Sequence, residues 1–196
     1  MSKGILSDGD YYCNHITAED KDDIKGFLVE RAYGLEYYIK NDAWVDELNG
    51  SMRTYIVRDE NTDELVGYFS LKAGMVSLNE HVEIDEESGM ERLYFDTLPG
   101  IEIADFAVND CYKRNNGVSG TGVVIFYDFI YKIVTEIAKG IGVKCLYIFA
   151  LPYDSLVERY RKYYHFERLD DKSEDELHKR LKPRYDRSCI FMYQVL

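Results

Sequence analysis

The most informative pattern of apolar and polar positions lies between Ile101 and Ala138. Residues 101–108 are rich in β-branched and aromatic side chains, which is typical of a strand. After Gly122, apolar residues recur with the spacing of one helix face: Ile125, Phe126, Phe129, Ile130, Ile133, Val134 and Ile137. A glycine-bearing turn, Gly117 to Gly122, joins the two elements. The unpaired N–H groups at the start of such a helix suit an anion such as phosphate, and a turn without a ligand is the alternative.

Shorter patterns predict the elements upstream of this stretch. Loosely alternating apolar residues favour a strand within residues 10–17, and apolar residues from Ile24 to Ala32 favour a helix of about three turns that starts in the acidic segment 18–23. A second helix is expected from Leu35 to Leu48, because Asn49-Gly50 is a strong stop signal. Residues 53–58 and 64–73 predict the strands of a hairpin. Gly67 in the second strand indicates a bulge, a close backbone approach or an ordinary strand position.

The downstream half of the chain contains one irregular stretch. Residues 75–99 are strongly acidic, so a solvated loop is expected. The nearly continuous apolar run at 144–150 predicts a buried strand, and Pro152 and Asp154 mark the start of another helix. A short helix is expected at 173–181 and a last strand at 188–196, with residues 166–169 as its partner.

Length and composition restrict the class of protein. The chain has 196 residues, which suits a single domain over residues 1–196. Its net charge of −12 disfavours sequence-independent nucleic-acid binding and fits a cationic substrate, a basic partner or simply an acidic surface. The cysteines and histidines show no metal-binding spacing, so no metal is expected. The first residues show no secretory signal and no run reaches the ~18 apolar residues of a membrane span, so we expect a cytoplasmic protein without membrane contact.

The glycine spacing distinguishes among phosphate-binding motifs. Gly117, Gly120 and Gly122 form G-x-x-G-x-G. This is neither the dinucleotide fingerprint G-x-G-x-x-G nor the P-loop, since no Gly-Lys-Ser/Thr follows. A dehydrogenase or a nucleotide kinase is therefore disfavoured.

The order of elements resembles the GNAT superfamily of acyl-CoA-dependent N-acyltransferases. Glu102-Ile103 and Ala107-Val108 on a strand are followed by the glycine motif, an amphipathic helix, the apolar strand at 144–150 and a tyrosine-rich helix that closes on Phe166. The resemblance covers residues 53–196. The sequence of the predicted hairpin, residues 53–73, is similar to that of small bacterial members, including toxins that acetylate aminoacyl-tRNA. It implies an α/β (α+β) fold with a mixed, mainly antiparallel central sheet flanked by helices. In that fold the cofactor strand parts from its neighbour like a V.

The resemblance implies acetyl-CoA as cosubstrate, with the pantetheine on the strand backbone and the pyrophosphate on the loop amides. The cofactor-binding residues that it implies are Phe106, Ala107, Val108, Gly117, Val118, Ser119, Gly120, Thr121, Gly122 and Tyr153. Gly117 stands where the family has Gln or Arg, and the connection after Val108 is longer than usual. Lys113 or Arg114 is therefore expected to supply the missing charge from an enlarged loop. Tyr153 takes the place of the family's Asn.

Two catalytic roles follow from the same resemblance. Counting from the end of the apolar strand places Tyr160 at the family's general acid, which protonates the leaving thiolate. Counting back from Phe166 gives Arg161 instead, and Tyr163 and Tyr164 remain rivals, with packing as the alternative role of all the tyrosines. Glu102 stands at the position of the base in the histone-acetylating branch, and an ordinary strand residue is its alternative.

The expected function is transfer of an acetyl group from acetyl-CoA to a primary amine by direct attack. A small cationic amine or a protein amine is the expected acceptor. One alternative is a toxin that acetylates aminoacyl-tRNA, which the hairpin sequence favours and the acidic net charge opposes. The other is a non-catalytic CoA-binding or partner-binding domain, and a homodimer is left open. The basic tail comprises Lys179, Arg180, Lys182, Arg184 and Arg187. It could contact RNA or the CoA 3′-phosphate, and a solvated connection is the alternative.

Overall fold

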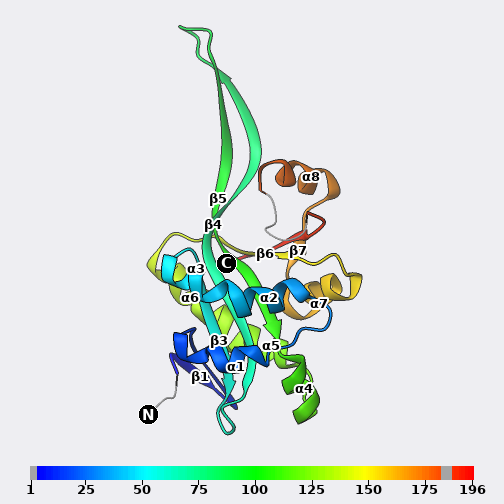
Figure 1. The fold of residues 1–196 in the computed structure, drawn as a ribbon. Helices are drawn as coiled ribbons and strands as arrows, with labels where there is room; N and C mark the ends of the chain where they lie inside the picture. The colour runs from blue at the N-terminus through cyan, green and yellow to red at the C-terminus, as the bar shows by residue number, and fades with distance from the viewer. Residues whose placement is uncertain (1–3, 182–186) are drawn as a thin grey trace. The chain divides into compact units, whose positions relative to one another are not determined.

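The computed structural model describes residues 4–181 and 187–196. The chain divides into two compact units, each made of two separate segments. Unit 1 contains residues 1–72 and 103–137, and unit 2 contains residues 73–102 and 138–196. Strands β4 (Leu65–Ile84) and β5 (Glu91–Val108) run through both units (Figure 1).

The sheet of unit 1 has the strand order β1-β2-β3-β4-β5. Strands β1 (Leu6–Asp8), β2 (Tyr11–His15) and β3 (Arg53–Asp59) pair antiparallel with their neighbours, and β3 and β4 form the predicted hairpin. A Cβ atom added to Gly67 would lie 2.7 Å from the carbonyl oxygen of Ala107 on β5. Of the alternatives left open at Gly67, the close backbone approach is confirmed, and the register between β3 and β4 also shifts beside it, between Val57 opposite Gly67 and Arg58 opposite Leu65.

An apolar layer joins the first helices of unit 1 to this sheet. The helices are η1 (Ala18–Asp20), α1 (Lys21–Lys25), α2 (Tyr33–Asn41) and α3 (Ala43–Asn49). They contribute Ile24, Tyr38 and Ile39 to a buried cluster that also contains Ile56 and Tyr68 of the strands. Burial of this apolar stripe is what holds such short helices in place.

The first helix is shorter than the sequence predicts. Helix α1 ends at Lys25, with Gly26 as its C-cap, so the three-turn helix expected through Ala32 is wrong. The backbone N–H of Leu28 donates to Asn109, that of Glu30 donates to Asp110, and that of Val29 donates to Glu36, at 2.9–3.3 Å. These bonds replace the helical ones. The second predicted helix is likewise interrupted, since α2 ends before Asp42 and α3 follows.

The helix predicted after the glycine turn is confirmed. It comprises α5 (Thr121–Ile125), a π-helical segment η2 (Phe126–Ile130) and α6 (Tyr131–Gly140). The apolar face is fully buried at Ile125, Phe126, Phe129, Ile130 and Val134. The π segment is not signalled by the sequence pattern.

Unit 2 has the strand order β4-β5-β6-β8-β7. Strand β8 (Ile190–Val195) pairs antiparallel with β6 (Cys145–Ala150) and with β7 (Glu167–Arg168). The pairing with β7 was predicted, and the pairing with β6 was not. Helices α7 (Asp154–Tyr164) and α8 (Asp171–Arg180) are also confirmed. Val76, Cys145, Tyr147, Leu177 and Phe191 form the buried cluster of this unit.

The acidic stretch at 75–99 is a long β-hairpin, so the expected loop is wrong. Figure 1 shows it as a two-stranded arm that extends beyond α8. The Asp85 carboxylate accepts hydrogen bonds from the backbone N–H groups of Glu87 and Ser88 and so fixes the turn. Val82, Ile84 and Leu93 are more than half exposed. Because the strands of the arm bury so little, no burial pattern marks them in the sequence.

No helix within residues 4–181 and 187–196 is both long and apolar enough to cross a bilayer.

Candidate functional site

Asn109 fixes the end of β5 in unit 1. Its Oδ1 atom accepts from the N–H groups of Leu28 and Cys111, and its Nδ2 group donates to the carbonyl oxygen of Leu65 at 2.9 Å. Asn109 thereby caps helix α4 (Asp110–Asn116). The enlarged loop expected between Val108 and Gly117 is therefore wrong, because most of this segment is helical. An Asn directly after a strand and before an acidic residue is the capping signal that could have revealed it.

The glycine turn takes the backbone conformation that only glycine adopts readily. Gly117 has a φ angle of 62° and Gly120 a φ angle of 78°. An added Cβ would meet nothing within 4 Å at either position, so the requirement is conformational and not steric. Within the described part of the chain, the N–H groups of residues 118–122 donate to no acceptor. The turn thus presents a row of free amide donors at the start of α5.

Thr121 adds a side-chain donor to this row. The residue is 3% exposed, and its Oγ1 atom has no hydrogen-bond partner among residues 4–181 and 187–196. A buried hydroxyl without a partner is unfavourable and calls for an explanation such as a bound group. Unpaired amide donors at a helix N-terminus fit a phosphate.

The basic residues expected to supply charge already have acidic partners. Lys113 forms an ion pair with Asp110, and Arg114 lies 2.8 Å from Glu30. The side chains of Arg114 and Glu30 are both more than half exposed, so their attraction is weak and Arg114 is able to exchange partners.

The remaining cofactor residues predicted in unit 1 lie on β5. Phe106 and Val108 are half-buried, and Ala107 is buried. Unit 1 thus carries Phe106, Ala107, Val108, Arg114 and the turn 117–122, whereas Glu102, Tyr153 and Tyr160 belong to unit 2.

Tyr160 lies on the buried face of α7, which begins after Tyr153. Its ring centroid is 5.3 Å from that of Tyr164 and 5.6 Å from that of Phe166. Burial, with a smaller effect of Tyr164, raises the pKa of Tyr160, so the hydroxyl keeps its proton at neutral pH. Tyr164 is also buried, whereas Tyr163 is 48% exposed.

His165 follows this helix in the left-handed backbone conformation that favours glycine. It has a φ angle of 57°, and the N–H of Phe166 donates to the carbonyl oxygen of Tyr160 at 3.1 Å. This non-glycine residue adopts the left-handed conformation that ends the helix, in spite of the strain that a side chain brings there.

Glu102 is buried on β5 at 8% exposure. Burial raises the pKa of the Tyr147 phenol in unit 2, and the nearby Glu102 carboxylate raises that pKa further. Glu102 is therefore not the outward-facing strand residue of the alternative interpretation. Tyr147 was missed by sequence reasoning, because a tyrosine in an apolar strand looks like an ordinary core residue.

A second buried carboxylate, Asp105, was also missed. It is 1% exposed on β5 in unit 1 and raises the pKa of Tyr38, although burial is the larger cause of the rise to about 12. Thr54 and Ser70 are fully buried in the same network, with their hydroxyl oxygens 2.9 Å apart. The signal available in the sequence was an aspartate in the middle of an apolar strand.

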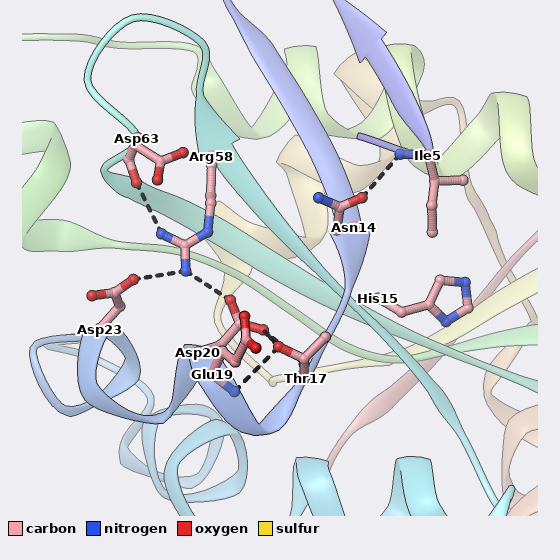
Figure 2. Close-up of a pocket in the computed structure, with 9 residues that line it drawn as sticks. All are labelled: Ile5, Asn14, His15, Thr17, Glu19, Asp20, Asp23, Arg58 and Asp63. Atoms are coloured by element: carbon pink, nitrogen blue, oxygen red, sulfur yellow. Dashed lines mark hydrogen bonds and ion pairs between the residues drawn. The ribbon is translucent and has the colours of Figure 1, made fainter. Parts of the chain in front are cut away.

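A surface cavity of about 530 Å³ in unit 1 has a different character (Figure 2). Arg58 projects into it and contacts Asp20 at 2.7 Å, Asp23 at 2.8 Å and the carbonyl oxygen of Asp63 at 2.9 Å. The guanidinium is therefore engaged by acidic partners and ties η1 and α1 to β3. None of the predicted site residues lines this cavity.

The described residues contain no group of three or more His, Cys, Asp or Glu side chains able to hold a metal ion. Cys13, Cys111, Cys145 and Cys189 are free thiols.

Comparisons by sequence give no match, either to a protein-family model or to a curated protein. Solved structures do match. The AtaTR complex bound with acetyl-CoA superposes with a TM-score of 0.63 at 14% identity, covering 95% of this chain and 93% of that chain. The fold of this chain is the GNAT fold. A KacTA–DNA complex gives 0.64 at 15% identity over 94% and 92% of the two chains. AtaT complexed with acetyl-methionyl-tRNA gives 0.60 at 14% identity over 84% and 91%.

The predicted fold class is confirmed, since helices flank a mainly antiparallel sheet. In the terms of the GNAT fold, β5 corresponds to the predicted cofactor strand and α5 to the helix that follows the glycine motif. Helix α7 carries the predicted tyrosine.

Proposed function

We propose that this chain is a single-domain N-acetyltransferase that moves an acetyl group from acetyl-CoA to a primary amine. The observation that carries the proposal is the glycine turn of a GNAT fold, with free amides at residues 118–122 and an unpaired buried hydroxyl at Thr121. These donors suit the pyrophosphate of CoA. In this proposal the backbone of residues 106–108 pairs with the pantetheine, and Arg114 and Tyr153 each contribute a side chain to cofactor binding.

Each catalytic residue has one task in the proposed reaction. Glu102, directly or through water, takes a proton from the ammonium form of the acceptor. The neutral amine then attacks the thioester carbonyl, a C–N bond forms, and the C–S bond breaks as the tetrahedral intermediate collapses. Tyr160 protonates the departing thiolate, and the second proton, lost from the acylated nitrogen, restores the Tyr160 hydroxyl. Burial raises the pKa of Tyr160, so the hydroxyl carries its proton before the thiolate appears; the same shift makes the phenol a weaker acid, so the role rests on its place on α7 and not on its pKa.

Acetyl-CoA binding is the first test. A ligand at ~100 times its dissociation constant stabilises a folded protein by about 2.7 kcal/mol, which a thermal-shift assay detects. A mass-spectrometric screen of pooled amines with acetyl-CoA then identifies the acceptor class. A melting temperature that does not respond to acetyl-CoA or to longer acyl-CoAs would overturn the proposal in favour of a partner-binding domain.

A second candidate acceptor is the α-amine of an aminoacyl-tRNA. The observation in its favour is the likeness to AtaT complexed with acetyl-methionyl-tRNA. The net charge of −12 opposes it, because RNA binding requires cationic surface. Of the basic tail, Lys179 is exposed on α8 and paired with Glu176, and Lys182 and Arg184 lie outside the described residues.

Salt dependence and direct assay separate the two acceptors. A small cationic amine steered by an acidic surface should be acetylated less efficiently as ionic strength rises. Incubation with acetyl-CoA and charged tRNA should then give no acetyl-aminoacyl product. If that product forms and expression arrests growth, the tRNA acceptor is established, and reversing the charge of Lys179 should weaken the reaction.

A further inference from the structure

The arm of unit 2, residues 75–99, carries half of the net charge of the chain. It contains seven Asp or Glu residues and a single Arg, whereas the whole chain has a net charge of −12. The Arg92 guanidinium lies 3.4 Å from the Asp85 carboxylate. Exposed glutamates of the arm that form no ion pair within the described part of the chain are Glu83, Glu86, Glu87 and Glu91. The arm thus presents a negative charge that its own side chains do not neutralise.

One face of the outer arm is apolar and uncovered. Side chains alternate along a strand, so Val82 and Ile84 share a face of β4. The backbone N–H of Asp85 donates to the carbonyl oxygen of Met90 at 3.0 Å, and this register, continued into the strands, places Leu93 opposite Val82. Val82, Ile84 and Leu93 are 58%, 61% and 56% exposed. These three residues form the apolar face of the arm.

The other face of the arm is polar. The Nε2 atom of His81 lies 2.9 Å from a carboxylate oxygen of Asp96 on the neighbouring strand, and Glu83 follows His81 on the same side of β4. An exposed apolar patch with a charged rim is typical of an interaction surface. A two-stranded hairpin that packs against nothing is also only marginally stable in water. Both considerations favour a partner that covers the apolar face.

We propose that the apolar face of the arm binds a lysine- and arginine-rich segment of another protein, whose own apolar side chains cover this face. Charge selects the class of partner. Glu91 lies opposite Ile84 beside the apolar face, and Glu86 and Glu87 lie in the turn, so cations of the bound segment can pair with them. Nucleic acid and anionic lipid would be repelled. A second copy would bring two arms of like charge together. The inference goes beyond the proposed acetyl transfer, and binding at the arm requires no acetyl-CoA.

The first test compares two short fluorescent peptides on the wild-type protein by anisotropy, without acetyl-CoA. One peptide alternates lysine with valine, and the other alternates lysine with serine at the same length and charge. The lysine–valine peptide should bind at least about tenfold more tightly, because it alone buries apolar surface. Its Kd should rise with salt, since exposed charges are screened. Equal affinity for the two peptides would overturn the inference, because charge alone would then account for binding.

The second test places the peptide on the arm. The triple variant Val82→Thr, Ile84→Thr, Leu93→Thr keeps β-branched residues on exposed strand positions and removes apolar surface. Its melting temperature should match that of the wild type, and its Kd for the lysine–valine peptide should rise about tenfold or more. Ile141→Thr is the matched control, because Ile141 is 60% exposed in unit 2 and lies outside the arm. This control should bind as the wild type does.

A charge variant tests the acidic rim in the same assay. Glu86→Gln with Glu87→Gln should weaken binding and reduce its salt dependence, whereas Asp175→Asn, at an exposed position of α8, should change neither. Equal losses in the arm variants and the controls would overturn the inference. So would a wild-type dimer in analytical ultracentrifugation that the triple variant abolishes, because a second copy would then cover the apolar face. Co-sedimentation of the wild type, but not the triple variant, with phosphatidylserine vesicles would overturn it in favour of a membrane contact.

Discussion

Replacing Thr121 with valine tests two expected effects of its unpaired buried hydroxyl: a loss of stability in the ligand-free protein and a gain in affinity for acetyl-CoA. In the ligand-free protein the Oγ1 atom has no partner among the described residues, and such a group costs about 1–3 kcal/mol. Valine replaces the hydroxyl by a methyl group of similar size. Thr121→Val should therefore raise the free energy of unfolding, by about 1 kcal/mol if part of the cost is already relieved. For a chain of this size that corresponds to a rise of about 2–4 °C in Tm.

The same substitution should weaken acetyl-CoA. Hydrogen bonds to charged groups contribute about 1.5–3 kcal/mol, and 1.4 kcal/mol is a factor of ten, so Kd should increase roughly 10- to 100-fold. Differential scanning calorimetry of the ligand-free protein measures the first effect, and isothermal titration calorimetry with acetyl-CoA measures the second. A more stable protein that binds its substrate less well is the expected outcome.

Thr135→Val provides the matched control on the same helical segment. The Thr135 hydroxyl donates to the carbonyl oxygen of Tyr131 at 2.7 Å, so it already has a partner. This variant should be no more stable than the wild type and should bind acetyl-CoA equally well. If Thr121→Val is less stable and its Kd is unchanged, the Thr121 hydroxyl has a structural partner, and the assignment of this turn to the pyrophosphate is refuted.

Three further predictions concern other parts of the chain. Tyr160→Phe should lower kcat by ~10²–10⁴-fold with little change in acetyl-CoA affinity, whereas Tyr163→Phe should retain activity; the reverse result in steady-state assays would assign the general acid to Tyr163. Gly67→Ala should destabilise the protein by about 1–3 kcal/mol in urea denaturation, because its Cβ would lie 2.7 Å from a backbone carbonyl oxygen of β5; equal stability would show that the strands move apart freely. Burial raises the pKa of Asp59, but hydrogen bonds led by that from Tyr112 outweigh it and hold the pKa below 3.8. The stability from this carboxylate should thus be present above about pH 4 and be lost as pH falls further, and the urea midpoint of Asp59→Asn should depend less on pH in that window.

The elements that follow from the sequence are those whose own side chains are buried. The helix from Thr121 to Gly140 and strand β6 (Cys145–Ala150) carry apolar periodicity because each buries a face or a whole strand. The arm of β4 and β5 buries too little to show such a pattern. The end of α1 depends on bonds from Leu28 and Glu30 to residues about eighty positions away, which a local pattern does not contain.

The candidate site divides in the same way. The glycine turn is recognisable because glycines at fixed spacing report a backbone requirement that is local to the turn. The burial of Glu102, and the effect of its carboxylate on the pKa of Tyr147, depend on which residues of different strands lie side by side.

The division of each unit between two chain segments affects how the protein is made. A ribosome delivers the chain from its N-terminus, and unit 1 is complete in sequence once Ile137 has been synthesised. Unit 2 must wait for β8 (Ile190–Val195), although its first segment, residues 73–102, was synthesised much earlier. The acidic arm and Glu102 therefore leave the ribosome well before the strand that completes their unit. Because both units are interrupted in sequence, neither can be produced as one continuous fragment. A fragment that spans all of unit 1 also contains residues 73–102 of unit 2, without the rest of that unit.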